Sequence, residues 1–314
     1  MRAAEGRVRA AVIRSFDGPG AVELTELDAP GIGPDDVLVK TAAAGVNPVD
    51  WKILYGGMRG AVPNHLPLVP GWDVAGTVLA AGPAIEGLAP GDRVAAYARK
   101  DHIQAGTFAE QVSVPGRAWA KVPDDVPLDV AAGVPLAGMT ADMLLDAARV
   151  ADGDTVLVHA AAGGVGSFAV QLARLRGALV LGTASARNHE YLSDLGAVPV
   201  EYGEGLVGNV RREAPDGVDA VIDLVGGDAL DASAEVLADG ARVASVVDPG
   251  VRERFGGRYV YVRPDRARLS RLLDQVAHGE LRVEIAERFP LDRARDALLT
   301  SERGHVRGKL VVTV

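Results

Sequence analysis

The sequence predicts an α/β protein in which a β-rich domain is joined to a doubly wound parallel-sheet domain. Short strand-like windows separated by Pro and Gly clusters fill the first 120 residues. From residue 124 onward, apolar strands alternate with helical windows, a pattern typical of a parallel sheet with helices on both faces. The chain ends in a further strand, Leu310–Val314, and its 314 residues suffice for two domains of ordinary size. We therefore expect one domain over residues 1–123 and 262–314, and an inserted domain over residues 124–261.

The individual elements follow from local patterns. In the β-rich part, strand-like windows with their turn residues lie at 37–40, 74–78, 91–94 and 106–114. Further on, helical windows lie at 131–149, 167–177, 188–195, 228–238 and 266–278. Apolar strands lie at 155–159, 178–183, 220–223, 242–247 and 259–262. The last strand of the chain is expected to rejoin the first domain.

The most specific motif is a loop of small residues between a strand and a helix. The stretch HAAAGGVGS at 159–167 follows the apolar run Thr155–Val158 and precedes an amphipathic run, Phe168–Arg176. Small residues let the backbone approach a pyrophosphate closely, and free N–H groups and the helix dipole attract its negative charge. The usual fingerprint, G-x-G-x-x-G, has a glycine where this chain has Ala161. A tight turn without a ligand is the alternative, but the flanking strand and helix favour a dinucleotide site.

The end of the next strand indicates which dinucleotide is bound. An NAD-binding protein usually places Asp or Glu there, about 20 residues past the glycine loop, to hold the ribose 2′-hydroxyl. Here the strand runs into Ser185 and Arg187, and no acidic residue occurs before Glu190. A hydroxyl and a guanidinium suit a 2′-phosphate, so the sequence favours NADPH. In the alternative interpretation, Ser185 caps a helix and Arg187 is a solvated surface residue.

Composition excludes several classes of function. The net charge of −9 argues against nucleic acid as a partner, because phosphate binding needs a basic face. The absence of cysteine excludes disulfides, thiolate zinc sites and cysteine nucleophiles, and is consistent with a cytosolic protein. No apolar run approaches the ~20 residues of a membrane span, and Met1–Arg9 lacks the apolar core of a signal peptide. We therefore expect a cytoplasmic protein without a membrane or nucleic-acid partner.

Six motifs, in order along the chain, carry a family resemblance. They are GVNPVDWK at 45–52, PGWDVAG at 70–76, GDRV at 91–94, PLAGMTA at 135–141, the loop region 158–172 and GHVRGK at 304–309. Together they resemble the zinc-free medium-chain dehydrogenases/reductases, in the quinone oxidoreductase branch that also contains alkenal, enone and enoyl reductases. The resemblance spans nearly the whole chain. It implies a GroES-like β-rich domain, a Rossmann domain with a doubly wound parallel sheet, and a homodimer.

The same resemblance implies a site without a metal ion. Zinc-dependent members of the superfamily carry Cys where this chain has Asn47, and Gly-His-Glu where it has Gly71-Trp72-Asp73. Without these ligands no Lewis acid is available to stabilise an alkoxide. A zinc-dependent alcohol dehydrogenase is therefore not expected.

The resemblance also assigns contacts to the cofactor. Near the nicotinamide and the pyrophosphate it places Asn47, Thr140, Ala162, Gly163, Gly164 and Val165. Around the adenosine phosphate, the ribose and the remaining phosphates it places Ser185, Arg187, Asn188, Tyr202, Val225, Val246, Arg307 and Lys309. Relatives often carry Lys for the 2′-phosphate where this chain has Asn188, with Arg187 beside it.

The chemistry implied is hydride transfer from NADPH to a quinone or to the C=C bond of an α,β-unsaturated carbonyl. Negative charge then develops on the acceptor oxygen, and donors aimed at that oxygen lower the barrier. The candidate catalytic residues are Asn47, Lys52 and Tyr55, with Asp50 orienting Lys52. In the alternative interpretation, Asp50 only caps a helix at 50–54 and Lys52 is a solvated surface residue.

Other conspicuous side chains are expected to be structural. His159 lies at a strand end beside the loop and is expected to be hydrogen-bonded rather than catalytic. Trp51 and Trp72 are expected to pack in the interior rather than to form a platform for a substrate.

Two further functions remain open from the sequence. One is an enoyl reductase that serves a single biosynthetic pathway, such as a polyketide pathway. The other is an NADPH-binding protein without catalytic activity. The loops that would line a substrate site carry no side-chain pattern that separates these possibilities.

Overall fold

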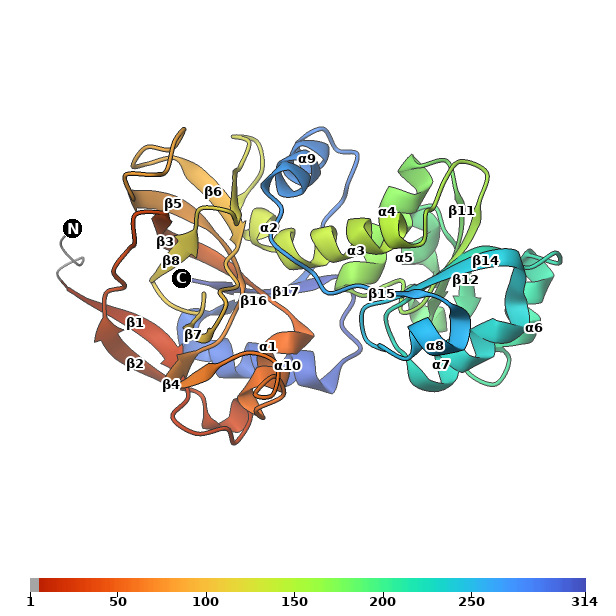
Figure 1. Cartoon of the computed structure of the whole chain (residues 1–314), viewed down its shortest axis with the longest axis horizontal. Coiled ribbons are helices and arrows are strands. Elements are labelled where there is room, and N and C mark those ends of the chain that lie inside the picture. The colour runs from red at the N-terminus through yellow and green to blue at the C-terminus, as the bar shows by residue number, and fades with distance from the viewer. Residues whose placement is uncertain (1–5) are drawn as a thin grey trace. The chain divides into compact units, whose positions relative to one another are not determined.

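The computed structural model describes residues 6–314, which form two compact units (Figure 1). One unit combines the chain up to Leu136 with Pro264–Val314, and the other is Ala137–Arg263. The sequence pattern predicts the first boundary earlier, at 123/124, because the helical windows begin soon after that position. The structure instead packs α2 (Leu128–Ala132) against the sheet of the first unit.

The first unit is built on a sheet with the strand order β16-β17-β3-β5-β6-β9, and β8 also pairs with β3. These strands are β3 (Asp36–Val46), β5 (Asp73–Ala81), β6 (Arg93–Tyr97), β8 (Gln111–Pro115), β9 (Trp119–Lys121), β16 (Ile285–Pro290) and β17 (Lys309–Thr313). Alternate residues such as Val37 and Val39 are buried in one core, because successive strand residues face opposite sides of a sheet. β17 pairs antiparallel with β3 and sets Leu310 opposite Val46, so the last strand rejoins the first domain as predicted.

Smaller elements complete the first unit. β1 (Arg7–Val12) pairs antiparallel with β2 (Glu23–Asp28), and β4 (Asn64–Val69) pairs parallel with β7 (Ile103–Ala105). The remaining elements are α1 (Pro48–Leu54), α9 (Arg266–Ala277), α10 (Ala294–Arg303), η1 (Pro19–Ala21) and η4 (Leu291–Arg293). α10 packs on α1, which holds the segment that carries the predicted catalytic residues.

The second unit contains a parallel sheet with the strand order β12-β11-β10-β13-β14-β15. Its strands are β10 (Thr155–Val158), β11 (Leu179–Ala184), β12 (Val198–Glu201), β13 (Val218–Asp223), β14 (Leu237–Ser245) and β15 (Arg258–Tyr259). The chain starts at the central strand β10, proceeds to one edge, and then continues from β13 to the other edge. This is a doubly wound topology, and it confirms the predicted fold class.

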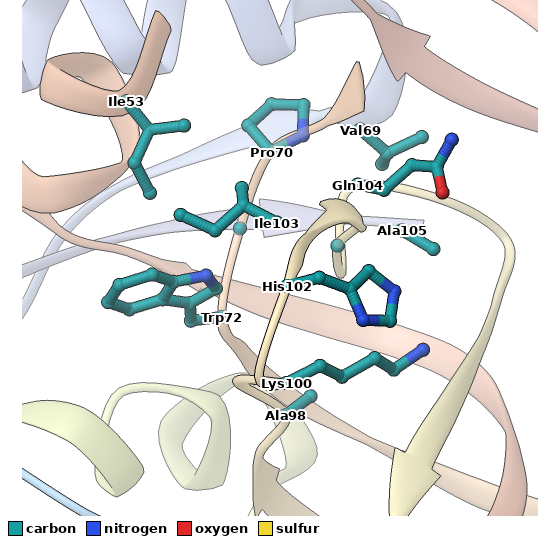
Figure 2. Close-up of a pocket in the computed structure, with 12 residues that line it drawn as sticks. Ile53, Val69, Pro70, Trp72, Ala98, Lys100, His102, Ile103, Gln104 and Ala105 are labelled. Atoms are coloured by element: carbon teal, nitrogen blue, oxygen red, sulfur yellow. The ribbon is translucent and has the colours of Figure 1, made fainter. Parts of the chain in front are cut away.

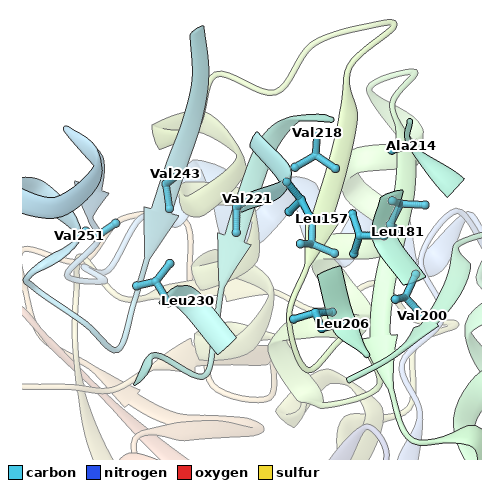
Figure 3. Close-up of a cluster of buried hydrophobic side chains, with 12 residues drawn as sticks. Leu157, Leu181, Val200, Leu206, Ala214, Val218, Val221, Leu230, Val243 and Val251 are labelled. Atoms are coloured by element: carbon cyan, nitrogen blue, oxygen red, sulfur yellow. The ribbon is translucent and has the colours of Figure 1, made fainter. Parts of the chain in front are cut away.

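Helices cover the faces of the parallel sheet. They are α3 (Pro135–Ala147), α4 (Gly164–Leu175), α5 (His189–Asp194), α6 (Leu206–Glu213), α7 (Gly227–Ser233) and α8 (Val251–Phe255), with η2 (Ala186–Asn188) and η3 (Ala234–Val236). Figure 3 shows the core between them, where Leu157, Leu181 and Val221 of the strands meet Leu206 and Leu230 of the helices. Strands that are buried on both faces consist of continuous apolar residues, and this pattern allowed the sequence to predict these strands. Within residues 6–314, no helix combines the length and apolar composition that crossing a membrane requires.

Some elements differ from the sequence prediction for identifiable reasons. The helical window at 131–149 consists of two helices, since Pro135 has no N–H group and disfavours a helical conformation in the residue before it. β12 was not predicted, because it is a short edge strand interrupted by Pro199. α6 contains Gly208, which weakens the helical signal. β16 and α10 were also missed, and the strand predicted at 259–262 is confined to Arg258–Tyr259.

Candidate functional site

The loop between β10 and α4 brings backbone N–H groups to one point. Gly163 is the N-cap residue of α4. The first N–H groups of any α-helix lack partners within the helix, and here they belong to Gly164, Val165 and Gly166. A methyl group at Gly166 would lie 2.3 Å from the carbonyl oxygen of Ala160, so the close turn requires a glycine there. The geometry suits an anion such as a pyrophosphate.

The structure explains how the loop tolerates Ala161 in place of the first glycine of the fingerprint. The side chain of Ala161 is fully buried, and its N–H donates to the Thr183 carbonyl at 2.9 Å. The Ala161 methyl lies over Gly182 of β11, where an added Cβ would approach it to 2.9 Å. The small residue needed for close packing between the loop and the strand is therefore supplied by Gly182. Ala161 faces the sheet and does not oppose a ligand at the helix start.

Most of the cofactor residues predicted for the second unit follow the carboxyl ends of its parallel strands, the edge at which doubly wound sheets bind ligands. They are Ala162, Gly163, Gly164 and Val165 after β10, Ser185, Arg187 and Asn188 after β11, Tyr202 after β12, Val225 after β13 and Val246 after β14. The register pairs Ala184 with Glu201, which makes Ser185 and Tyr202 neighbours at this edge. Thr140 is instead a buried residue of α3.

The segment after β11 keeps its polar side chains near the surface. Ser185 is the N-cap residue of η2, as the alternative interpretation expected, but its hydroxyl makes no capping hydrogen bond. The Asn188 amide nitrogen lies 3.5 Å from the Ser185 hydroxyl oxygen. Arg187 is exposed on the same turn. The Ser185 hydroxyl therefore keeps its own proton available for a ligand oxygen.

One buried carboxylate holds the turns that carry Val225 and Val246. Asp223 Oδ1 accepts hydrogen bonds from the backbone N–H groups of Val225 at 3.0 Å and Gly226 at 2.8 Å. Its Oδ2 accepts the Ser245 hydroxyl at 2.6 Å. The Ser245 oxygen in turn accepts the N–H groups of Val247 and Asp248, at 3.1 and 2.9 Å. Sequence reasoning missed Asp223, although an acidic residue at the end of an apolar strand was the available signal.

His159 is structural, as expected. It is buried, and its Nε2 lies 2.7 Å from the Ser233 hydroxyl. That hydroxyl donates to the Ala229 carbonyl at 2.9 Å, so His159 Nε2 is the donor toward Ser233. Burial lowers the pKa of His159, and the nearby Asp223 opposes this shift only in part.

In the first unit, the structure corrects the role predicted for Asp50. Asn47 is the N-cap residue of α1, and Asp50 is the third helical residue. The Asp50 Oδ2 accepts the Asn47 backbone N–H at 2.8 Å, which together with the Asn47 side chain completes a capping box. Residues two apart on a helix do not face each other, so Asp50 does not orient Lys52.

The other two catalytic candidates lie at the end of α1. Lys52 is exposed, and its ammonium lies 5.4 Å from the centroid of the Trp51 ring. The Tyr55 hydroxyl donates to Glu302 Oε1 of α10 at 2.8 Å. This hydrogen bond raises the pKa of Tyr55. Lys52 therefore presents a cation to solvent, whereas the Tyr55 hydroxyl is already donating a hydrogen bond to a carboxylate.

Lys309 does not lie where the resemblance placed it. It was expected to reach the cofactor phosphates, but only 4% of it is exposed. Its ammonium donates to the Val46 carbonyl at 2.9 Å and to Asn47 Oδ1 at 2.5 Å. The preceding residue, Gly308, has a positive φ of 73° and lies against the Glu284 backbone, where a Cβ atom would not fit. Arg307 remains exposed, with its guanidinium 3.8 Å from Glu284 Oε1.

The side chains around Asn47 do not fit a zinc ion. The Asn47 amide nitrogen donates to Asp73 Oδ2 at 2.9 Å, and the Leu136 N–H donates to Asp73 Oδ1 at 3.0 Å. The ammonium of Lys309 is already bonded to Asn47, and zinc favours thiolate and imidazole ligands. Across the described part of the chain, no group of three His, Asp or Glu side chains is arranged to hold a metal ion.

A shallow pocket of the first unit adjoins the segment 69–72. Figure 2 shows Trp72, Lys100, His102 and Ile103 among its lining residues. Trp72 is buried and meets Tyr97 edge-on with ring centroids 5.9 Å apart, which confirms its predicted packing role. Burial lowers the pKa of Lys100.

Comparison with known proteins identifies the family. Residues 33–124 match the family model of the alcohol dehydrogenase GroES-like domain, and residues 195–312 match that of the zinc-binding dehydrogenases. The chain is 31% identical to the chloroplast envelope quinone oxidoreductase homolog of Arabidopsis thaliana, over 98% of this chain and 99% of the relative. It is 34% identical to the chloroplastic NADPH-dependent alkenal/one oxidoreductase of the same plant, over 93% of this chain and 77% of the relative.

A solved structure agrees with these relatives. The quinone oxidoreductase from Coxiella burnetii superposes with a TM-score of 0.90 at 32% identity, covering 98% of this chain and 100% of that chain. The chain therefore belongs to the medium-chain dehydrogenase/reductase superfamily, in its group of quinone and alkenal/one oxidoreductases, and is an oxidoreductase that uses a nicotinamide cofactor.

Proposed function

We propose that the protein transfers hydride from NADPH to a quinone or to the C=C bond of an α,β-unsaturated carbonyl, without zinc. The observation that carries the proposal is the loop between Ala160 and Gly166, whose backbone N–H groups converge at the start of α4. Relatives that align over nearly the whole chain are quinone and alkenal/one oxidoreductases, which supports the two acceptor classes.

The choice of NADPH over NADH rests on the segment after β11. The Ser185 hydroxyl makes no capping hydrogen bond, and Arg187 is exposed beside it. No carboxylate stands there to hold a ribose 2′-hydroxyl, since the first acidic residue is Glu190. Asn188 and Tyr202 would complete the contacts to the adenosine phosphate. One relative carries NADPH dependence in its name.

The cofactor supplies the hydride, and the side chains position and polarise the acceptor. We assign Asn47 and Thr140 to the nicotinamide, and Val225 and Val246 to the nicotinamide and its ribose. The exposed ammonium of Lys52 can stabilise the negative charge that develops on the acceptor oxygen. Tyr55 stays a second candidate donor, and its hydroxyl would first have to break its hydrogen bond to Glu302.

A screen of acceptors tests the function. Purified protein is mixed with quinones, simple enals and enones, and enoyl thioesters, each with NADPH and with NADH, and the loss of reduced-cofactor absorbance is followed. We expect turnover of a quinone or an enone with NADPH preferred. Turnover confined to enoyl thioesters would instead support a pathway-specific enoyl reductase. NADPH binding without turnover of any acceptor would contradict the proposal and support a non-catalytic binding protein.

We also propose a homodimer, which the resemblance implies, and a cytoplasmic location, which the absence of cysteine favours. The mass of the protein in solution tests the first, and cell fractionation tests the second.

A further inference from the structure

Two carboxyl groups and one amine are buried together at the start of α1. Asp50 and Asp73 are both 0% exposed, and Lys309 is 4% exposed. They come from α1, β5 and β17, all within the first unit. Asn47 joins them through its side-chain amide, in a residue that is 3% exposed. A net charge held this deep is costly, so the protonation states of these groups must nearly balance.

The hydrogen bonds distinguish the two carboxyl groups. Both oxygens of Asp73 accept N–H donors, one from the Asn47 amide at 2.9 Å and one from the Leu136 backbone at 3.0 Å. Asp50 receives one donor, the Asn47 backbone N–H on Oδ2 at 2.8 Å. Its Oδ1 is buried without a hydrogen-bond partner among residues 6–314. A carboxylate satisfied at both oxygens is stable as an anion, whereas a buried oxygen without a donor favours the protonated form.

Charge counting gives the same assignment. One ammonium and two carboxylates sum to −1, and a single added proton makes the cluster neutral. We propose that Asp50 is a neutral carboxylic acid in the folded enzyme, and that Lys309 is a positioning residue that fixes the Asn47 side chain against Asp73. The amide of Asn47 is held at both ends, with Oδ1 on the Lys309 ammonium and Nδ2 on Asp73. The role of Asn47 in turnover rests on the proposed function, whereas the position of the proton does not.

The pKa values agree with this geometry. Burial raises the pKa of Asp50 from 3.8 to about 8 and that of Asp73 to about 6, so Asp50 holds the proton at neutral pH. The charged groups that act on Asp50 are Asp73, which raises its pKa, and Lys309, which lowers it. α10 also packs on α1, but it directs Glu302 to the Tyr55 hydroxyl.

The sign of the pH dependence follows from linkage. Below pH 3.8, Asp50 is protonated in both folded and unfolded chains. Between pH 3.8 and about 8 only the folded chain holds the proton, so rising pH favours unfolding. Above about 8 the group is ionised in both states and contributes no further change. A raised carboxyl pKa thus removes stability as the pH rises through this window.

Two isosteric substitutions test the assignment in the whole enzyme. Asp50→Asn keeps an acceptor for the Asn47 N–H and keeps the cluster neutral. In Asp73→Asn, one of the two oxygens that accept hydrogen bonds becomes an NH2 group, and this donor faces another N–H donor. We expect Asp73→Asn to destabilise the protein far more than Asp50→Asn at pH 7, measured by urea unfolding.

The ratio of the unfolding constants of wild type and Asp50→Asn should rise with pH, by up to about tenfold per unit, and level off above pH 8. Equal losses in the two variants, or a ratio that does not rise, would overturn the assignment.

Infrared spectroscopy gives a readout that requires neither turnover nor unfolding. The wild-type protein at pH 7 should show the carbonyl stretch of a protonated carboxyl group, and Asp50→Asn should lack it. Absence of this band from the wild-type protein would contradict a neutral Asp50 even if the enzyme turns over.

The positioning role of Lys309 is tested by kinetics. We expect Lys309→Met to lower kcat by about 10- to 100-fold with a smaller change in the KM for NADPH, since a displaced Asn47 misaligns the reacting groups. Lys309→Arg should restore part of kcat. An unchanged kcat in Lys309→Met would refute the positioning role. If no acceptor is turned over, the proposed function fails, while the infrared and unfolding results still decide the location of the proton.

Discussion

The two units form their candidate sites from different parts of the polypeptide. In the second unit, backbone N–H groups at the start of α4 converge because Gly166 and Gly182 lack side chains. In the first unit, the side chains of Asn47, Asp73 and Lys309 bond to one another in the interior. The site of the second unit depends on the absence of side chains at its glycines, and the site of the first unit depends on charge and hydrogen-bond direction. Substitutions should therefore act on the two units through different physical effects.

The largest expected effect is at Asp223, a buried carboxyl group that holds backbone groups of the second unit. Asp223→Ala leaves the N–H groups of Val225 and Gly226 and the Ser245 hydroxyl without their acceptor. We expect the free energy of unfolding to fall by about 3 kcal/mol or more, and NADPH affinity to fall with it. Urea unfolding and a binding titration measure the two effects.

A matched control lies on the same strand. Asp219 also accepts a backbone N–H, that of Thr155 at 2.8 Å, but at the amino end of β13. Asp219→Ala should lower stability while leaving the NADPH affinity of the folded protein unchanged. Equal loss of affinity in both variants would show that Asp223 has no special relation to the cofactor.

The next largest effect is expected from a methyl group added to the loop between β10 and α4. Gly166→Ala places Cβ 2.3 Å from the Ala160 carbonyl oxygen, so the loop must shift. We expect a loss of about 1–3 kcal/mol of binding free energy, roughly 10- to 100-fold in the Kd for NADPH. Gly208→Ala is the control, since a methyl group there meets open space within α6. Unchanged affinity in Gly166→Ala would show that the loop does not hold the cofactor.

The cofactor preference should respond to a smaller change. If Arg187 binds the 2′-phosphate as proposed, removing its guanidinium takes away a charge-assisted donor. We expect Arg187→Ala to weaken NADPH binding by about tenfold and to leave NADH binding unchanged. Arg212→Ala removes the same charge from an exposed position near the end of α6, in the same unit. An equal effect of both substitutions would show that the preference for NADPH over NADH comes from positive charge in general and not from a specific contact of Arg187.

The smallest effect is expected at an exposed side chain of the first unit. Tyr55→Phe removes the hydrogen bond to Glu302, in a residue that is 54% exposed. The free energy of unfolding should change very little, because water can replace the lost partner. We also expect kcat to change less than in Lys52→Met. The opposite order of the two kcat values would assign the donor role to Tyr55.

The sequence predicted the site of the second unit better than that of the first, because only the former is formed by local sequence patterns. The loop and the strand ends were predictable, since strand, glycine turn and helix are local patterns. The burial of Lys309 was not, because it depends on the pairing of Leu310 with Val46, far apart in the chain. The role of Asp50 was misassigned, since Asn47 rather than Asp50 starts the helix. Long-range pairing and the direction of a buried side chain leave no local signature.

The role of the Ala160–Gly166 loop in NADPH-dependent reduction is tested most directly by one comparison of rates. The loss of NADPH absorbance is followed with a simple quinone and with a simple enone, for the wild type, Gly166→Ala and Gly208→Ala at a limiting NADPH concentration. We predict rapid oxidation of NADPH with at least one acceptor by the wild type and Gly208→Ala, and a strongly reduced rate with Gly166→Ala. No oxidation by the wild type, or equal rates in all three proteins, would contradict this function.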